Sequence, residues 1–510
     1  MIFDRTFHPD EANQAITTGK LLETGRYTYQ PNDHHGPTLY YAAAAIQKFA
    51  GRSSCAELDG TLLRSTSLIS AIGAILLIFF GIRRFTKSFL AAFLGIFFLA
   101  LSPIFIFFAT DFIQEMIFAT TLAFMFFSAS RYISWRDGER LKRGSWAIFF
   151  GIGTGLAFAT KETCILSFAS AALSLTAIIL IYKQKLDLTL KEKINSSIFA
   201  IFSFFLTAIL LYSSFGADMT GVYNAFIKAP SMYFQRAQGS ALSEGANYHV
   251  HEWWWYLKLL FFPDMGNFKI FESLPPAKAF SRIFTFGWRF SLLPLIFAIS
   301  LGFSNGKSRI SKIFLFTTLY SFILLLIYSL IPYKTPWCML TVVEGMAISA
   351  ALGTWIFLSS NKKPWVKIAA FSIIFALSLF INIRGIIFIN KYPDVKTIPY
   401  NYAHASYDVQ DLAEKTISSL KASNNDFEYA AIILPREDTW PLPWYLRKYS
   451  KRIGYWQDAK SFINFAKRNP PVCIITTPSE EESLGEFTKT LPNKSTHSIR
   501  PGKIVNIFTK

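Results

Sequence analysis

The sequence predicts an all-α polytopic membrane domain followed by a small α/β domain at the carboxyl end of the chain. Of its 510 residues, 52% are hydrophobic and only 16% are charged, whereas a soluble domain usually carries about 25% charged residues. The apolar residues gather in blocks of about 17–23, the length that crosses a hydrocarbon core. After about residue 391, short apolar strands alternate with helical stretches, which is typical of an α/β layer fold.

Ten apolar blocks are expected to span the membrane. Residues 38–50 are too short to cross and predict a helix lying on the membrane surface instead. The ten blocks lie at about 62–82, 88–108, 114–132, 145–160, 164–182, 197–215, 288–303, 312–331, 337–358 and 366–388.

The distribution of positive charge predicts how these spans are oriented. Alternate loops contain eighteen Lys and Arg against four acids, so the positive-inside rule makes them cytoplasmic. These basic loops are residues 83–87, 131–143, 183–193, 307–312 and 362–367. The net charge of +18 is explained by these loops. Because no basic stripe occurs on a soluble element, a nucleic-acid partner is excluded.

The remaining loops are then extracytoplasmic and contain all seven histidines. They are residues 1–61, a long loop at 216–287, the tail, and three short loops at 109–113, 161–163 and 332–336. The membrane domain is placed at 62–390 and the soluble tail domain at 391–510. The chain is predicted to be a multi-pass protein of the cytoplasmic (inner) membrane with an extracytoplasmic active face. Because no export signal precedes residues 1–61, an additional upstream helix is expected.

The tail predicts a compact domain of its own. Residues 428–434, 452–456 and 472–477 read as short buried strands, and residues 457–468 and 479–490 as helices. None of the four cysteines has a metal-like spacing, and a disulfide between two of them cannot be inferred from sequence.

Two acidic motifs are candidates for chemistry. In the first, Asp10 and Glu11 follow His8-Pro9, where a carboxylate could act as a general base or bind a metal, or Asp10 could simply cap a helix. In the second, Asp111 and Glu115 lie at the start of a predicted span. Their spacing of four predicts one helix face, and ionisable residues at such an edge usually face a cavity.

Basic and imidazole side chains lie in the same predicted outer regions. His34 and His35 precede Gly-Pro in a fixed turn. Lys161 and Glu162 share a tight turn, where they could neutralise each other or Lys161 could contact a lipid phosphate. Lys334 is bracketed by two prolines, which favours a defined site over a lone snorkelling side chain.

Two tryptophans of the tail have two possible roles. Trp440 and Trp444 stand in the stretch WPLPWYLR (440–447). Their rings could stack on a sugar face or dock the tail against the membrane domain, and the sequence does not decide between the two.

The ordered set of motifs resembles the GT-C superfamily, which includes protein O-mannosyltransferases and aminoarabinose lipid A transferases. More narrowly, it is similar to a prokaryotic family of flippase activity-associated membrane proteins, grouped with glycosyltransferase family 39-like proteins. The motifs are HPDEA (8–12), YTYQPNDHHGPTLYY (27–41), ATKET (159–163), YKTPW (333–337), YAHAS (402–406) and WPLPWYLR (440–447).

The resemblance implies transfer of a sugar from a polyprenyl-phosphate donor to an extracytoplasmic acceptor that it does not identify. Asp10 is then expected to be the base, Glu11 its charge-tuning or metal-binding neighbour, and Asp111 a second acid. Lys161 and Lys334 are expected phosphate contacts. The other expected substrate-binding residues are His34, His35, Glu115, Glu162, His404, Trp440 and Trp444. A divalent metal is possible as cofactor, with no ligand set assigned.

Two rival functions remain to be weighed. One is a non-catalytic membrane component that assists translocation or handling of a lipid-linked glycan. The other is a transporter, which would carry charges near the bilayer midplane and show internal repeats. The predicted spans are nearly free of charge and no repeat is visible, so the transporter is disfavoured.

Overall fold

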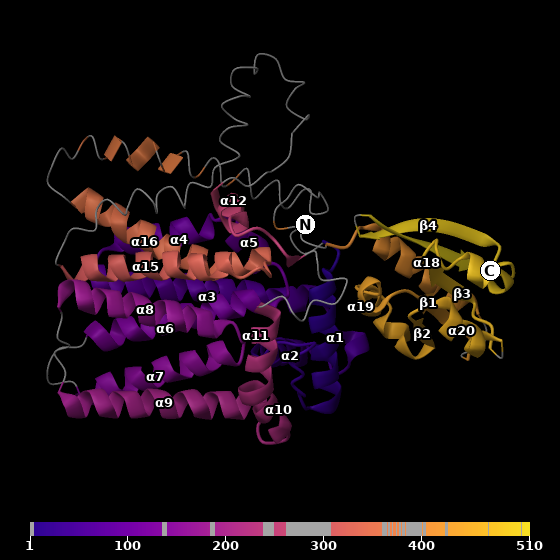
Figure 1. The fold of residues 1–510 in the computed structure, drawn as a ribbon, viewed down its shortest axis with the longest axis horizontal. Helices are drawn as coiled ribbons and strands as arrows, with labels where there is room; N and C mark the ends of the chain where they lie inside the picture. Colours follow the sequence, from indigo (N-terminus) through magenta and orange to yellow (C-terminus); the bar gives the residue numbers. More distant parts are fainter. Residues whose placement is uncertain are drawn as a thin grey trace, which may run out of the picture.

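A computed structural model places a bundle of long helices beside a separate α/β domain at one end of the bundle (Figure 1). The structure describes residues 5–134, 140–183, 189–237, 249–261, 308–359, 404–423, 427–467, 469–500 and 502–510, with Tyr400 and isolated positions between 365 and 383.

Six described helices are long and apolar enough to cross a membrane, and a bent pair could make a seventh crossing. The shorter helix α7 (Arg140–Phe158) packs between two of them, α6 and α9. The predicted spans 288–303 and 366–388 lie outside the fully described residues. The six helices are α3 (Gly60–Thr86), α6 (Gln114–Ser134), α8 (Cys164–Tyr182), α9 (Leu190–Tyr212), α15 (Arg309–Leu330) and α16 (Met339–Ser359).

The predicted span at 88–108 is a bent pair of helices. Helix α4 (Phe89–Ala100) ends before Ser102, and α5 (Pro103–Ala109) leaves it at an angle of 70°. Pro103 cannot supply the backbone N–H that would continue α4, and it disfavours helical geometry in the residue before it. The bend places the residues after α5 near the α/β domain.

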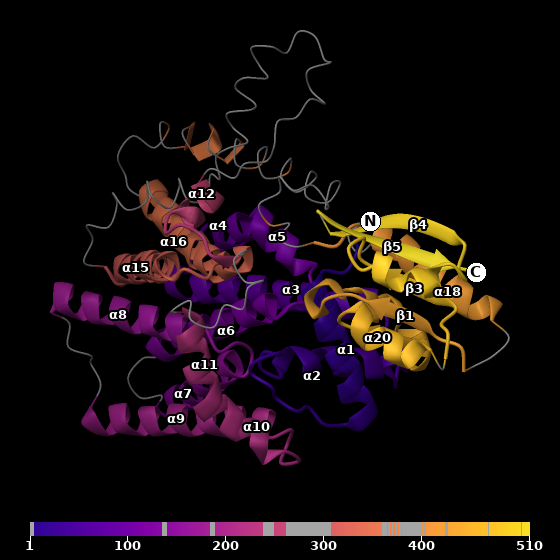
Figure 2. The same ribbon diagram turned by 45° about the vertical axis from the view of Figure 1, so that its right-hand side comes forward.

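The end of the bundle nearest the α/β domain is called the mouth. Helices α3, α6, α8 and α16 begin there, whereas α7, α9 and α15 end there (Figures 1 and 2). The basic ends of the described spans therefore lie at the opposite end of the bundle, where Arg309 donates to the carbonyl of Ile133. This arrangement agrees with the charge pattern, which makes all the basic loops share one side.

Short helices build the mouth. The predicted surface helix at 38–50 is α2 (Thr38–Phe49), which packs against α1 (Pro9–Thr24) and α3. The other short elements are α10 (Met219–Tyr223), the π-helix η2 (Asn224–Lys228), α11 (Ala229–Ala237) and α12 (Trp255–Phe261).

The tail forms a five-stranded sheet in the order β2-β1-β3-β5-β4. The three predicted strands are present and parallel, but the sequence missed the antiparallel hairpin of β4 and β5. The predicted helix at 479–490 is only two short turns, η9 (Glu482–Leu484) and α21 (Gly485–Thr488). The strands are β1 (Ala430–Ile433), β2 (Ile453–Trp456), β3 (Cys473–Thr476), β4 (Asn493–Arg500) and β5 (Lys503–Thr509), covered by α18 (Asp408–Ala422) and α20 (Ala459–Ala466).

Candidate functional site

Helix α1 begins with a cap that treats the two acids of its first turn differently. His8 is the N-cap: its Nδ1 accepts the Asp10 N–H at 3.1 Å, and the Glu11 carboxylate accepts the His8 N–H at 2.9 Å. Asp10 is therefore not the helix cap, which corrects that interpretation of the sequence. Its side chain is 50% exposed, and its Oδ2 lies 3.7 Å from His8 Nδ1.

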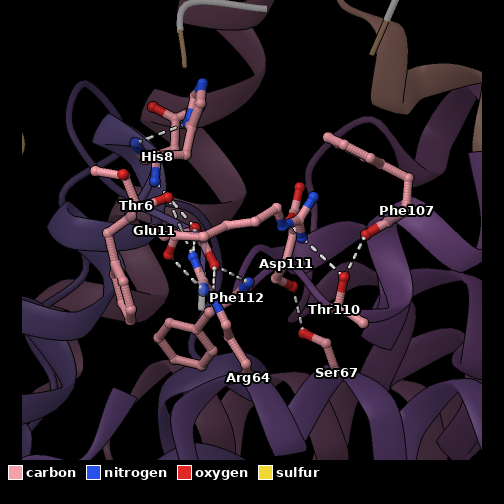
Figure 3. A network of polar contacts seen from close by, with 12 residues as sticks. Thr6, His8, Glu11, Arg64, Ser67, Phe107, Thr110, Asp111 and Phe112 are labelled. Carbon is pink, nitrogen blue, oxygen red and sulfur yellow. Dashed lines mark hydrogen bonds and ion pairs between the residues drawn. The ribbon is translucent and has the colours of Figure 1, made fainter. Parts of the chain in front are cut away.

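Glu11, by contrast, is buried and ion-paired (Figure 3). Arg64 of α3 donates to both of its carboxylate oxygens at 2.7 and 2.8 Å, and Phe112 N–H donates at 2.8 Å. Burial alone would raise the pKa of Glu11, but the charge and hydrogen bonds of Arg64 prevail and lower it to about 2. Glu11 therefore anchors α1 to the membrane domain.

Asp111 is buried next to the same network, in the turn between α5 and α6 (Figure 3). Its carboxylate pairs with Arg5, which also donates to Thr110 Oγ1 at 2.8 Å. Burial and the nearby Glu11 raise the pKa of Asp111 to about 6, against the opposing charge of Arg5. Since α6 begins only at Gln114, Asp111 lies outside the helix and does not share a helix face with Glu115.

Glu115 and Lys161 form a second buried pair. Lys161 Nζ donates to Glu115 Oε1 at 2.5 Å, and both side chains are about 5% exposed. Burial would lower the pKa of Lys161, but the charge of Glu115 raises it. The interpretation of Lys161 and Glu162 as a self-neutralising pair is therefore wrong, because each has a different partner.

Glu162 instead binds the turn that precedes α2. Tyr29 Oη donates to its Oε1 at 2.5 Å, and His35 Nδ1 lies 2.7 Å from its Oε2. Tyr233 Oη is 3.1 Å from the same His35 nitrogen. Burial would raise the pKa of Glu162, but His35 lowers it. The neighbouring His34 lies 3.5 Å from Thr17 Oγ1 on α1.

Lys334 is buried, not snorkelling. Its side chain is almost wholly enclosed and donates to the carbonyl of Ile331, while its backbone N–H donates to His249 O at 2.8 Å. Burial lowers the pKa of Lys334. No carboxylate among the described residues forms an ion pair with Lys334.

Two imidazoles connect Lys334 with Asp10. Burial lowers the pKa of His249 to about 4, against the opposing charge of Asp10. Burial and then the charge of Lys334 lower the pKa of His251. The Lys334 N–H that donates to His249 O and the stacking of His249 on Tyr333, with ring centres 4.5 Å apart, place the two histidines beside Lys334, and the charge of Asp10 reaches His249.

His404 packs against the helix cap. Its ring centre is 4.8 Å from that of His8 and 5.6 Å from that of Phe107 in α5. The segment leading into the α/β domain therefore contacts the residue that caps α1.

Trp444 docks the α/β domain. It is buried in α19 (Leu442–Tyr445) and stacks on Phe7, with ring centres 4.5 Å apart. Trp440 is partly buried against the same cluster of apolar residues. In this structure the docking alternative therefore holds for Trp444.

The residues missed from sequence are mainly the cations that hold the acids. Arg5 and Arg64 are both buried. Arg64 offered a signal, because an ionisable residue within an apolar span is costly and marks a specific contact. Arg5 offered none. Among the described residues, no group of three or more His, Cys, Asp or Glu side chains could hold a metal ion.

Comparisons with known proteins agree with this architecture. ArnT from Cupriavidus metallidurans bound to undecaprenyl phosphate matches with a TM-score of 0.63 at 12% identity, covering 99% of this chain and 95% of that one. The apo state of the same ArnT matches with a TM-score of 0.58 at 13% identity, covering 99% of this chain and 94% of that one. The oligosaccharyltransferase of Archaeoglobus fulgidus, in complex with Zn and sulfate, matches with a TM-score of 0.54 at 12% identity, covering 96% of this chain and 66% of that one.

The chain therefore has the fold of the GT-C superfamily of membrane glycosyltransferases, which confirms the predicted fold class. Residues 40–217 match the model of the dolichyl-phosphate-mannose-protein mannosyltransferase family. No protein among the curated ones matches the chain.

Proposed function

We propose that the protein transfers a sugar from a polyprenyl-phosphate donor to an acceptor hydroxyl at the mouth, with Asp10 as the general base. The observation that carries this proposal is that the predicted acids differ in burial and in ion pairing. Glu11, Asp111 and Glu115 are each buried against a cation. Asp10 keeps a half-exposed carboxylate at the rigid start of α1, where it can reach a substrate.

The groups beside Asp10 fit the phosphate of the donor. Lys334 forms no ion pair among the described residues, although the charge of Glu252 reaches it, and Nε2 of His251 is buried without a hydrogen bond. A phosphate would give Lys334 a charged partner in addition to the Ile331 carbonyl and would give His251 Nε2 a hydrogen-bond partner, and charge-assisted hydrogen bonds of this kind are strong. Lys161 fits less well, because Glu115 already neutralises it. The undecaprenyl phosphate held by the similar ArnT supports a lipid-linked donor of this class.

The proposed step moves one proton and one sugar. The acceptor oxygen attacks the anomeric carbon while its proton passes to the Asp10 carboxylate. The bond from the anomeric carbon to the phosphate oxygen breaks, and its electron pair leaves with the lipid phosphate. Lys334 and His251 would stabilise the charge of that phosphate. On this proposal, Glu11 and Asp111 hold the site in place.

The experiment that tests the proposal uses purified protein and a panel of radiolabelled polyprenyl-phosphate sugars. Sugar release is expected with at least one donor, and Asp10→Asn is expected to lower it at least 100-fold, since a positioned base contributes about 10²–10⁴-fold. The control Glu414→Gln removes an exposed carboxylate from α18 and should leave the rate unchanged.

The outcomes separate the competing functions. Asp10→Asn at the wild-type rate would exclude Asp10 as the base. Tight binding of a lipid-linked sugar without any release would favour the non-catalytic alternative, in which the protein handles a lipid-linked glycan.

A further inference from the structure

Phe7, three residues before Asp10, lies between the membrane domain and the α/β domain. Its ring stacks on Trp444 with an interplanar angle of 17°. The Arg64 guanidinium carbon also lies over the Phe7 ring, 4.4 Å from its centre. The Phe7 N–H donates to Tyr445 Oη at 2.9 Å. Both the side chain and the backbone of Phe7 are thus held by α19 of the α/β domain.

The residues just before Phe7 are held by the membrane domain. Arg64 donates to the carbonyls of Arg5 at 2.8 Å and Thr6 at 3.3 Å. The segment that leads to Asp10 is therefore held by the membrane domain at residues 5 and 6, and by both domains at Phe7, where Trp444 and Tyr445 of the α/β domain add their contacts. Since His8 caps α1 directly afterwards, a displacement of Phe7 is transmitted to the first turn of the helix.

The contact between the two rings depends on a glycine in α3. A Cβ on Gly60 would lie 3.0 Å from the Phe7 ring and 3.4 Å from Trp444. The absence of a side chain at this position lets both rings pack at the start of α3. The α/β domain also holds the membrane domain through Arg447, which donates to Leu58 O at 2.8 Å.

We propose that Trp444 and Tyr445 are positioning residues for the transfer reaction, through which the α/β domain sets the place of Asp10 in the mouth. The inference rests on the proposed function, in which Asp10 is the base. A general base must come within about 3 Å of the proton it removes, and a displacement of 1 Å can reduce the rate about 100-fold. The α/β domain is then a part of the catalytic apparatus although it contributes no reacting group.

The test compares two tyrosine hydroxyls of the same domain. Tyr445→Phe removes the acceptor for the Phe7 N–H and keeps the ring. Its matched control, Tyr429→Phe, removes a hydroxyl that donates to Asn469 O at 2.8 Å, away from the mouth. We expect Tyr445→Phe to lower kcat about 3- to 10-fold with an unchanged KM for the donor, and Tyr429→Phe to behave as wild type.

Trp444 provides a second comparison. Trp444→Leu should lower kcat more than Tyr445→Phe does, because it removes the ring that stacks on Phe7. Trp444→Phe should keep most of the wild-type kcat because an aromatic ring remains. Hydrogen–deuterium exchange provides a measurement that does not depend on activity. Peptides covering residues 5–12 should exchange faster in Tyr445→Phe and Trp444→Leu than in wild type or Tyr429→Phe.

The kinetic and exchange measurements together test whether Trp444 and Tyr445 position Asp10. Wild-type kcat in both Tyr445→Phe and Trp444→Leu would overturn the positioning role, even if the proteins were less stable. If wild-type protein transfers no sugar from any donor, the proposed function fails by itself. The coupling between the domains is then decided by exchange alone, and unchanged exchange at residues 5–12 would overturn it too.

Discussion

Adjacent residues at the mouth perform different tasks because their partners come from distant parts of the chain. Asp10 and Glu11 are neighbours in sequence, yet Glu11 is buried against Arg64 and Asp10 is half exposed. Lys161 and Glu162 are also neighbours but pair with Glu115 and His35. The motifs could therefore be found from the sequence, whereas the pairings could not, since they depend on tertiary packing.

The first prediction at the residue scale concerns Lys334. Lys334→Ala should weaken binding of a polyprenyl-phosphate sugar more than Lys334→Arg, because arginine keeps the positive charge that pairs with the phosphate. Equilibrium binding of a radiolabelled donor measures this. Lys448→Ala, which removes an exposed lysine of the α/β domain, is the control. Equal affinity for Lys334→Ala and wild type would contradict the role of Lys334.

A second prediction follows from the raised pKa of Asp111, about 6 in the folded protein against a reference value of 3.8. The folded state then binds this proton more tightly than the unfolded state. This contribution to stability is complete below about pH 4 and is lost as pH rises through about 6. Glu11, whose pKa is lowered to about 2, has the opposite effect on the pH dependence of stability. Its contribution to stability is present above about pH 4.5 and is lost as the pH falls toward 2.

The measurement is the unfolding temperature as a function of pH. In wild type, the unfolding temperature should fall between about pH 4 and 6 because Asp111 loses its proton. Asp111→Asn should abolish this fall. The separate fall in unfolding temperature toward pH 2, which Glu11 causes, should remain. An identical pH profile for wild type and Asp111→Asn would show that Asp111 does not titrate in this range.

At the scale of elements, turn geometry decides what the mouth can contain. Gly36 lies in the turn between His35 and α2, and a Cβ there would be 2.2 Å from the backbone oxygen of Ala159 and 2.9 Å from Tyr212 Oη. The same carbonyl accepts the Thr38 N–H at 3.1 Å. This close approach of two backbones is what brings His35 against Glu162.

Gly36→Ala should therefore destabilise the protein by about 1–3 kcal/mol, because a backbone carbonyl cannot give way cheaply. The loss should appear as a lower unfolding temperature in detergent. Gly485→Ala is the matched control, since a Cβ at Gly485 meets nothing within 4 Å. Similar unfolding temperatures for the two variants would contradict the close packing of this turn.

The sequence predicted those helices and strands whose position is marked by a run of hydrophobic residues. It did not predict the elements that lack such a run, or a break inside one. The buried strands β1 and β3 are short apolar runs and were found from sequence. Strand β4 has the sequence NKSTHSIR, in which every residue except Ile499 is polar, so hydrophobic periodicity gave no sign of it. The break between α4 and α5 lies inside a continuous apolar run, and only Ser102-Pro103 marks it.

At the scale of the whole molecule, the structure and the charge pattern lead to one topological prediction. Reporter fusions after Lys183, at the basic end of α8, and after Lys510, in the α/β domain, should report opposite sides of the membrane. The physical reason is that Lys183 lies at the basic end of the bundle and the α/β domain lies beside the mouth, and helices long enough to cross a membrane separate these two ends. The same sidedness for both fusions would refute the orientation.

The short helix α4 has a consequence for the lipid around the protein. Its 12 residues extend about 18 Å at 1.5 Å per residue, against a hydrocarbon thickness of about 30 Å. The remainder of this crossing is α5, which is bent by 70° and has most of its side chains buried. A bilayer adapts to such hydrophobic mismatch by thinning. We therefore expect the two leaflets to approach each other beside α4, which would shorten the path of the proposed donor's headgroup to the bend between α4 and α5.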